Sequence, residues 1–143
     1  MIVIRQCTHE DFTQIFLLLQ QLWPEKTLDY ELLCRVYSRG LESVAQRHLC
    51  AVEDMKIVGF CSLTILNSLW QTGHLAHIDE LVVNQEKRGQ GIGTALLDAI
   101  TKVAREAGSS TLELDSAFHR SRAHKFYEQQ GFTNRAYLFS KPL

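Results

Sequence analysis

The sequence predicts a mixed α/β fold in which helices cover a single central sheet. Apolar residues recur at helical spacing in about four segments, and short runs rich in β-branched residues lie between them. The chain has 143 residues, of which 45% are apolar and 22% are charged, and this composition supplies enough apolar surface to bury a core. We therefore expect one layered α/β domain covering residues 1–143.

The first half of the chain predicts a strand, two helices and a hairpin. Thr8 is a favourable N-cap for the first helix, and Pro24 ends that helix because proline cannot continue it. Asp54-Met55 separates two strand-like runs, and Gly59 within the second run indicates a bulge or a close contact. The expected elements are a strand at 2–7, helices at 12–22 and 28–43, and strands at 48–53 and 56–66.

The second half of the chain continues the alternation of strands and helices. Gly108 and Gly131 follow the two later helices, where a left-handed C-cap favours glycine. Residues 67–73 form a loop, in which Trp70 either caps the edge of the core or walls a binding pocket. The expected elements are a strand at 75–83, a helix at 92–107, a strand at 111–115, a helix at 122–130 and a strand at 133–141.

The charge balance argues against a nucleic-acid or membrane partner. Fifteen Lys and Arg residues stand against 16 Asp and Glu residues, for a formal net charge of −1, whereas neutralising phosphates requires a basic excess. The longest apolar runs have four or five residues, far fewer than the roughly 20 that span a bilayer. The N-terminus lacks the pattern of a secretory signal, so we expect a cytoplasmic protein.

The cysteines and histidines do not predict a metal site. The four cysteines contain no Cys-x-x-Cys pair, which indicates reduced thiols packed in the core. His74 and His77 lie three residues apart in a predicted strand, and that spacing places them on opposite faces. No metal is therefore expected.

Three glycines lie just before and within the start of the helix predicted at 92–107. They belong to the segment Arg88-Gly89-Gln90-Gly91-Ile92-Gly93-Thr94, between a strand and the helix. Glycine lets the backbone approach a ligand and turn its N–H groups inward, and the helix N-terminus adds the positive end of its dipole. The turn therefore predicts a site for an anion such as a pyrophosphate.

Two common phosphate-binding turns fit this segment poorly. An ATP-binding P-loop requires a lysine directly before Thr94, where Gly93 stands. A dinucleotide-binding fingerprint requires a third glycine at the position of Thr94 and lies early in the chain. A turn that uses glycine for shape alone rarely needs three of them so close together.

The glycine turn and the last predicted helix resemble the GNAT superfamily of N-acetyltransferases. Arg88 to Gly93, preceded by Leu81-Val82-Val83, resembles the acetyl-CoA-binding motif Gln/Arg-x-x-Gly-x-Gly/Ala. Ala123 to Phe132 resembles the last helix of the superfamily and its Tyr-x-x-x-Gly-Phe ending. The resemblance implies the GNAT fold, a mixed sheet flanked by about four helices in the order β-α-α-β-β-β-α-β-α-β.

Within the superfamily, the chain looks most like small-amine acetyltransferases, and aminoalkylphosphonate N-acetyltransferases are the nearest type. This finer resemblance is carried by residues 78–83, 122–127 and 139–143. One position departs from the pattern, because Arg120 stands where many members carry an asparagine that contacts the cofactor. Arg120 either meets a cofactor phosphate or leaves that contact absent.

The resemblance also implies how acetyl-CoA, the donor, is bound and how the reaction is assisted. The turn amides would hold the pyrophosphate, and the exposed strand backbone would pair with the pantetheine arm and polarise the thioester carbonyl. Tyr127 would protonate the departing thiolate as the general acid, or would only pack at the helix end. The implied cofactor-binding residues are Leu81, Val82, Val83, Arg88, Gly89, Gln90, Gly91, Ile92, Gly93 and Thr94.

Two adjacent acids are the candidates for the general base. Asp79 and Glu80 lie on the strand that would carry the acetyl group, and similar family members have an acid at one position or the other. In a regular strand only one of them faces the cleft, whereas a β-bulge would bring both into reach. We expect Asp79 as the base, Glu80 as the second candidate and His77 as the third, and one acid could instead only orient structure.

These features predict transfer of acetyl from acetyl-CoA to a small primary amine, by direct attack with general acid–base assistance. The alternatives are a protein acetyltransferase acting on a lysine or an N-terminus, and a non-catalytic acyl-CoA-binding module. A small-amine pocket would be closed by the first two helices and the loop at 67–73. We also expect a homodimer, as is common in the superfamily. Candidates for holding an acidic group of the acceptor, each of which could equally be a solvated surface group, are Arg35, Arg39, Arg47, His48 and His124.

Overall fold

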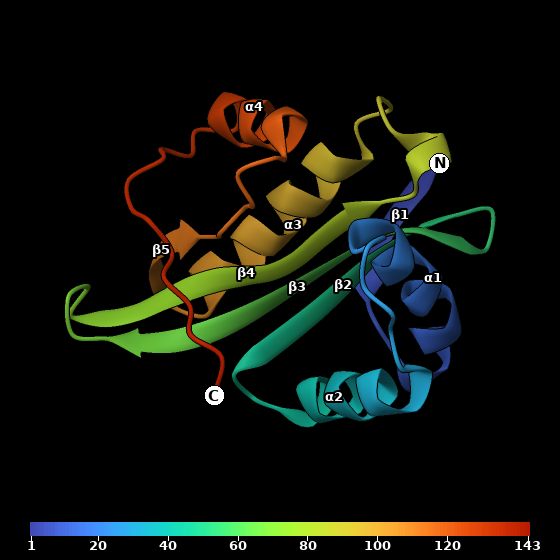
Figure 1. Ribbon diagram of the computed structural model, residues 1–143, viewed down its shortest axis with the longest axis horizontal. Helices are drawn as coiled ribbons and strands as arrows, with labels where there is room; N and C mark the ends of the chain where they lie inside the picture. Colours follow the sequence, from blue (N-terminus) through green and yellow to red (C-terminus); the bar gives the residue numbers. More distant parts are fainter.

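A five-stranded sheet forms the centre of the computed structural model, which describes residues 1–143 (Figure 1). The strands lie in sequence order, the first four antiparallel and the last parallel to its neighbour. They are β1 (Ile2–Gln6), β2 (Gln46–Glu53), β3 (Lys56–Ser68), β4 (Gly73–Val83) and β5 (Ser109–Glu113). The helices are α1 (Phe12–Leu22), α2 (Tyr30–Glu42), α3 (Ile92–Glu106) and α4 (Ser121–Gln129), with 3-10 turns η1 (His9–Asp11) and η2 (Gln85–Lys87).

Helices cover both faces of the sheet, and each face has its own apolar cluster. α1 and α2 lie on one face, where Phe12 and Ile15 pack with Phe60 of β3 (Figure 1). α3 lies on the other face and buries Leu96 and Ile100 against the sheet. Each large apolar side chain buried in this way contributes about 1.5–3 kcal/mol. The sheet is therefore fixed from both sides, and its long central strands are positioned rigidly. No helix combines the length and apolar composition that crossing a membrane requires.

Most of the predicted elements are confirmed, with ends displaced by no more than about two residues. The predicted hairpin turn is present, and both Asp54 (φ 49°) and Met55 (φ 66°) have the positive φ of a two-residue type I′ turn. The ladder between β2 and β3 changes register beside Gly59. A Cβ on Gly59 would lie 2.7 Å from Leu96 Cδ1, so the position combines a bulge with a close contact.

The strand predicted at 133–141 is absent, so the observed order ends at α4. Residues 133–143 are all exposed, and none of their backbone groups enters a ladder. A strand is stabilised by hydrogen bonds to a neighbour, and local composition does not reveal whether a neighbour is in place. This expectation was wrong: after α4 the segment runs past β5 without pairing with it, and the sheet ends at β5 (Figure 1).

Trp70 has neither of the two roles considered for it. The loop that carries it joins β3 to β4 at the far end of the long hairpin, and 84% of the Trp70 surface is exposed. It therefore caps no part of the core, and it is absent from the walls of the cavities described below.

Candidate active site

The central feature of the site is a separation between β4 and β5. The two strands pair from His74 to His77, with Ser109 and Glu113 as partners at the two ends of the ladder. Beyond His77, β4 continues to Val83 without a neighbour on that side. A cavity of about 710 Å³ opens there between β4, the glycine turn and α4.

The glycine turn presents unpaired backbone amides to this cavity. None of the N–H groups from Arg88 to Thr94 donates a hydrogen bond within the chain. Gly89 and Gly91 have φ of 79° and 83°, in the left-handed region that glycine adopts without strain, and Gly91 is the N-cap of α3. Together with the dipole of α3, these unpaired donors have the chemistry that binds an anion.

Nine of the ten predicted cofactor-binding residues line the cavity. Gln90 alone is absent from its walls. Val82 and Ile92 bury their side chains in the two apolar clusters, so their backbone is the part available to a ligand. The residues that line the cavity as predicted are Leu81, Val82, Val83, Arg88, Gly89, Gly91, Ile92, Gly93 and Thr94.

The cavity walls carry positive charge and no acidic side chain. The cationic side chains in its lining are Lys87, Arg88, Arg120, Arg122 and Lys125. Lys87 is paired with Glu53 at 2.7 Å, at the outer end of the site. The net charge of the whole chain is −1, so this concentration of cations is local. A ligand with several phosphate groups suits such walls.

Sequence reasoning found Tyr127 of α4 but missed the polar face that this helix also turns to the cavity. Arg122, Lys125 and Gln129 all line the cavity, and their spacing of three and four residues places them on one face of the helix. That spacing was the available signal. It did not indicate that the face would turn toward the glycine turn rather than toward solvent.

Tyr127 lies in the cavity wall with its ring fixed by neighbouring aromatic rings. The ring packs edge-on against Phe126 and Phe132, with centroids 5.5 and 5.7 Å away. Its hydroxyl makes no hydrogen bond within the chain, and burial raises the pKa of the phenol. Tyr127 is thus protonated at neutral pH and has a proton available for a ligand in the cavity.

Arg120 links the start of α4 to the end of α1 across the cavity. It precedes α4, and its Nη2 donates a hydrogen bond of 2.7 Å to the backbone oxygen of Leu22 at the end of α1. Leu22 and Gln21 also line the cavity. One nitrogen of the guanidinium is therefore hydrogen-bonded to the end of α1, and the positive charge of Arg120 still lies in the cavity wall.

A β-bulge places Asp79 and Glu80 on the same face of β4. In the ladder with β3, Ser62 faces Glu80 whereas Leu63 faces Ile78, so Asp79 is an extra residue. Ser62 Oγ donates to Glu80 Oε1 at 2.5 Å, and Thr64 Oγ1 donates to Asp79 Oδ2 at 2.5 Å. Since Ser62 and Thr64 lie two apart in β3, they share a face, and both acids meet that face.

The bulge also changes which neighbours share a face with Asp79. A regular strand would have grouped Asp79 with Leu81 and Val83. Instead, Leu81 and Val83 pack with the cluster under α3, and Val82 packs with the cluster under α1 and α2. The grouping of a regular strand does not hold here, because the extra residue inverts the alternation from Glu80 onward.

The two acids lie in different surroundings. Glu80 is half-buried, and burial is the main cause that raises its pKa, while the bond from Ser62 opposes that rise. Asp79 Oδ1 lies 3.1 Å from His77 Nδ1, and His77 Nε2 lies 3.1 Å from Asp115 Oδ1. The hydrogen bond with Asp79 is the main cause that raises the pKa of His77. His77 thus connects the site to exposed Asp115 at the surface.

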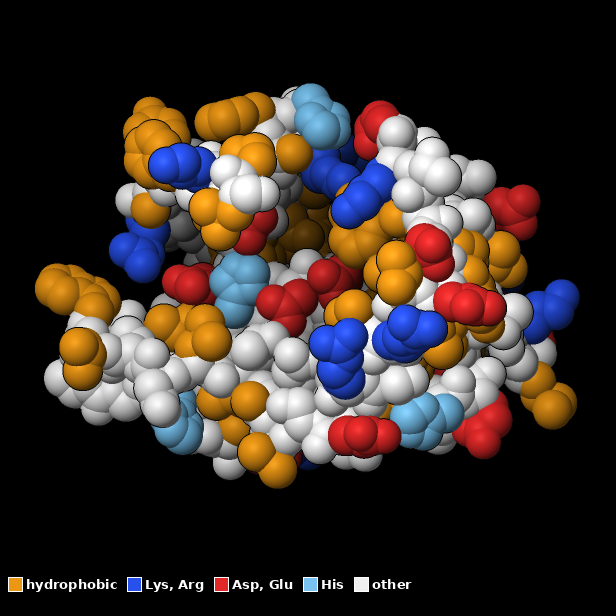
Figure 2. Space-filling model, turned by 60° about the horizontal axis from the view of Figure 1, so that its bottom comes forward, with side chains coloured by type: hydrophobic (Ala, Val, Ile, Leu, Met, Phe, Trp, Pro, Cys, Tyr) orange, Lys and Arg blue, Asp and Glu red, His pale blue; other side chains and the backbone are white.

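A second cavity, of about 310 Å³, lies on the same face as the two acids. It lies between α1, α2 and the sheet and opens to solvent beside Val36. Glu80 of β4 lines this cavity, and the next residue, Leu81, lines the first cavity. Figure 2 shows a hollow in the molecule, with acidic side chains gathered along its lower edge and Lys and Arg side chains at its upper edge; of the two cavity linings, the first carries cations and the second carries acids. The lining residues are Phe12, Leu19, Trp23, Leu33, Val36, Tyr37, Gln46, His48, Phe60, Thr64, Asp79 and Glu80.

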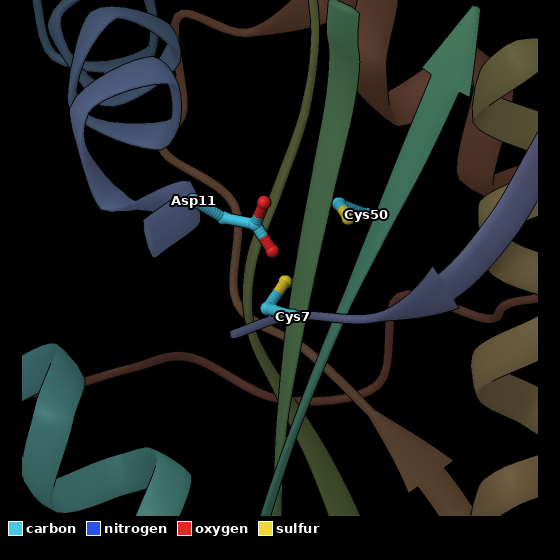
Figure 3. A group of neighbouring side chains, drawn as sticks. All are labelled: Cys7, Asp11 and Cys50. Atoms are coloured by element: carbon cyan, nitrogen blue, oxygen red, sulfur yellow. The ribbon is translucent and has the colours of Figure 1, made fainter. Parts of the chain in front are cut away.

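A third group of polar side chains lies away from both cavities. Cys7, Asp11 and Cys50 point toward one another beneath α1 (Figure 3). Arg5 donates to both oxygens of Asp11, at 2.7 and 2.9 Å, and the Thr8 amide donates to one of them at 2.7 Å. These bonds fix the start of α1 to β1, so the group has a structural role.

Comparison with known proteins agrees with this architecture. The acetyltransferase (GNAT) family matches residues 6–132. An aminoalkylphosphonate N-acetyltransferase of Salmonella typhimurium is 31% identical over 140 residues, which cover 98% of this chain and 90% of that protein. The uncharacterized N-acetyltransferase YhdJ of Bacillus subtilis is 32% identical over 149 residues, covering all of both chains.

Solved structures show the same fold. The crystal structure of a transcriptional regulator from Bacillus halodurans C-125 superposes with a TM-score of 0.91 and 25% identity over the whole of both chains. A putative acetyltransferase from Agrobacterium tumefaciens gives a TM-score of 0.88 at 24% identity, with 99% of each chain covered. Since the family match extends from the first strand to the end of the last helix, this chain belongs to the GNAT family of acetyl-CoA-dependent N-acetyltransferases.

Proposed function

We propose that this enzyme transfers the acetyl group of acetyl-CoA to a small primary amine held in the second cavity. The observation that carries the proposal is the meeting of two cavities of opposite charge on consecutive residues of β4. Leu81 ends the cationic cavity with the unpaired amides, and Glu80 ends the acidic cavity. An anionic donor and an ammonium acceptor would therefore meet at this point of the strand.

The residues of the first cavity suit the donor. The amides from Arg88 to Thr94 would hold the diphosphate, and Arg122 and Lys125 would pair with further phosphate charge. The β4 backbone beyond His77 has a free edge along which an extended arm can pair as an added strand does. Acetyl-CoA supplies an activated acyl group, and the chain supplies its orientation.

The residues of the second cavity suit deprotonation of the acceptor. An ammonium has no lone pair, so a base must remove its proton before attack. The raised pKa of Glu80 makes it a stronger base than an ordinary carboxylate, and the bond from Ser62 orients it. We assign the proton transfer to Glu80 and give Asp79 the role of positioning, since Asp79 is held between Thr64 and His77.

The remaining steps fall to the β4 backbone and Tyr127. A backbone N–H near Leu81 would donate to the carbonyl oxygen as negative charge develops on it. The amine nitrogen forms the new C–N bond as the C–S bond breaks, and Tyr127 donates its proton to the departing sulfur. The proton that the nitrogen loses on becoming an amide returns to the Tyr127 oxygen and restores the phenol. The raised pKa keeps Tyr127 protonated at neutral pH, and the absence of a hydrogen bond from its hydroxyl to the chain leaves that proton free for the sulfur.

The two alternative functions fit the geometry less well. A protein acetyltransferase needs an acceptor groove open along the strands, whereas α1 and α2 cover the acidic cavity. A non-catalytic module would need neither the paired acids nor the unbonded hydroxyl of Tyr127.

The test is thiol release from acetyl-CoA with a panel of small primary amines and a lysine-containing peptide. Amine-dependent release that exceeds release with the peptide by more than about 10-fold in kcat/KM supports the proposal. Binding of acetyl-CoA without release by any acceptor would indicate the non-catalytic module. Preference for the peptide would indicate a protein acetyltransferase.

We also propose a homodimer formed through the exposed C-terminal segment. The outer edge of β5 has no neighbouring strand, and Tyr137, Leu138 and Phe139 are 77%, 71% and 90% exposed. An extended apolar segment beside a free sheet edge is suited to pairing with a second copy. Light scattering should give twice the mass of 16.4 kDa, and Leu138→Asp should shift the protein to the monomer. A monomeric wild type would contradict the proposal.

A further inference from the structure

We infer that the acceptor is a primary amine with an apolar or aromatic body and no acidic group. The inference rests on the proposed function, and it concerns which amines the second cavity accepts. Asp79 and Glu80 are the only acidic or basic side chains in the lining apart from His48, and no Lys or Arg contributes to it. An acidic group on the acceptor would therefore lie near two carboxylates without a cation to balance it.

The cations that could have held such a group lie elsewhere. Arg35 and Arg39 line a separate groove on the outer side of α2, together with Glu31 and Glu42. Arg47 Nη1 donates to the backbone oxygens of Val44 and Gln46, at 2.6 and 3.0 Å. Neither arrangement presents a guanidinium to the acidic cavity.

His48 does not replace the missing cation. Its ring lies within about 26° of parallel to the rings of Tyr37 and Phe60, with centroids 5.4 and 5.8 Å away, and Tyr37 and Phe60 also contact each other, with centroids 6.4 Å apart. Burial lowers its pKa, which keeps the imidazole neutral. The His48 side chain thus contributes an aromatic face to the cavity wall rather than a charge.

The remaining walls suit a hydrocarbon or aromatic body. Phe12, Trp23 and Phe60 contribute rings, and Leu19 and Leu33 contribute aliphatic surface. Tyr37 also turns its ring to the cavity, since its hydroxyl is already used in a 2.6 Å bond to the Thr8 carbonyl. Aromatic faces attract an ammonium as well as apolar groups. The cavity walls and the two acids therefore both favour an amine with an apolar or aromatic body.

The test compares amines that differ only by an acidic group. In the thiol-release assay we expect kcat/KM for 2-phenylethylamine to exceed that for phenylalanine by at least about 100-fold. Phenylalaninol, which carries a neutral group at the same carbon, controls for crowding and should stay within about 10-fold of 2-phenylethylamine. Propylamine and 3-aminopropylphosphonate form a second pair, with the same order expected.

A charge placed in the cavity wall provides the matched variant. Val36 lines the cavity and is 58% exposed, so Val36→Arg adds a cation at the mouth without disturbing the core. It should reduce the preference for propylamine over 3-aminopropylphosphonate by at least about 10-fold. Leu32→Arg, on the same helix and 57% exposed but outside the lining, should leave the ratio unchanged.

The outcomes separate this inference from the proposed function. If the wild type uses 3-aminopropylphosphonate or phenylalanine as well as it uses the uncharged partner of each pair, the inference is wrong while acetyl transfer stands. If no amine of either pair releases thiol from a protein that binds acetyl-CoA, the proposed function fails and this inference fails with it.

Discussion

The hydroxyl of Tyr127 lies in the wall of the cationic cavity without a hydrogen bond to the chain, and its removal provides a test at the scale of one residue. Tyr127→Phe keeps the ring that packs on Phe126 and Phe132 and deletes only the proton donor. We expect kcat to fall roughly 100-fold, because the thiolate then leaves without a proton, while Tm and KM for acetyl-CoA change little. Steady-state kinetics and thermal unfolding check this. Full turnover at all pH values would contradict the role.

The two adjacent carboxylates differ in how they should respond to pH. A base must be deprotonated to act, so kcat/KM should rise with pH through the raised pKa of Glu80. Glu80→Gln should lose this acidic limb and roughly 100-fold in rate. Asp79→Asn is the matched control, and it should lower the rate while keeping the limb. If Asp79→Asn lost the acidic limb and Glu80→Gln kept it, Asp79 would be the base, as the sequence analysis expected.

At the scale of an element, the turn before α3 depends on backbone conformation rather than on space. Gly91 has a φ of 83°, and a Cβ there would meet nothing within 4 Å. Gly91→Ala should therefore cost about 1–2 kcal/mol through strain alone and raise KM for acetyl-CoA as the amides turn away. Gly73→Ala is the control, since that site has open space and no positive φ. If Gly91→Ala and Gly73→Ala changed the free energy of unfolding in urea and the KM for acetyl-CoA equally, this account would be contradicted.

At the scale of the whole molecule, the cationic cavity joins α4, the turn and the end of α1, so a bound donor should stabilise the entire fold. At about 100 times its Kd, acetyl-CoA should add about 2.7 kcal/mol, or a rise in Tm of roughly 5–10 °C. The rise should shrink in high salt, because phosphate pairing is screened. Differential scanning measures both. An unchanged Tm at saturating acetyl-CoA would remove the basis of the proposed function.

Local patterns were sufficient for most elements and for finding the glycine turn that lines the cationic cavity. The apolar spacing of residues 12–22 and 92–107 is visible in the sequence because burying one helix face requires it. The glycine turn is equally visible, since positive φ limits the choice of residue. Turn chemistry also placed the hairpin at Asp54-Met55.

The acceptor site could not be predicted in the same way. Its walls come from α1, α2 and three strands, and Phe12, Tyr37 and Phe60 look like ordinary core residues until the chain is folded. The strand expected at 133–141 failed for a related reason, because pairing depends on a neighbour and not on composition.

The sequence by itself determined the helices, the glycine turn and the family, because each depends on residues close together in the chain. Only the tertiary structure decided that Asp79 and Glu80 face one cavity, that β4 parts from β5 beyond His77, and that α4 turns its cations toward the turn. Each of these depends on the register between strands or on the placement of distant elements. One extra residue in a ladder inverts the faces that follow it, and a short pattern in sequence does not encode that shift.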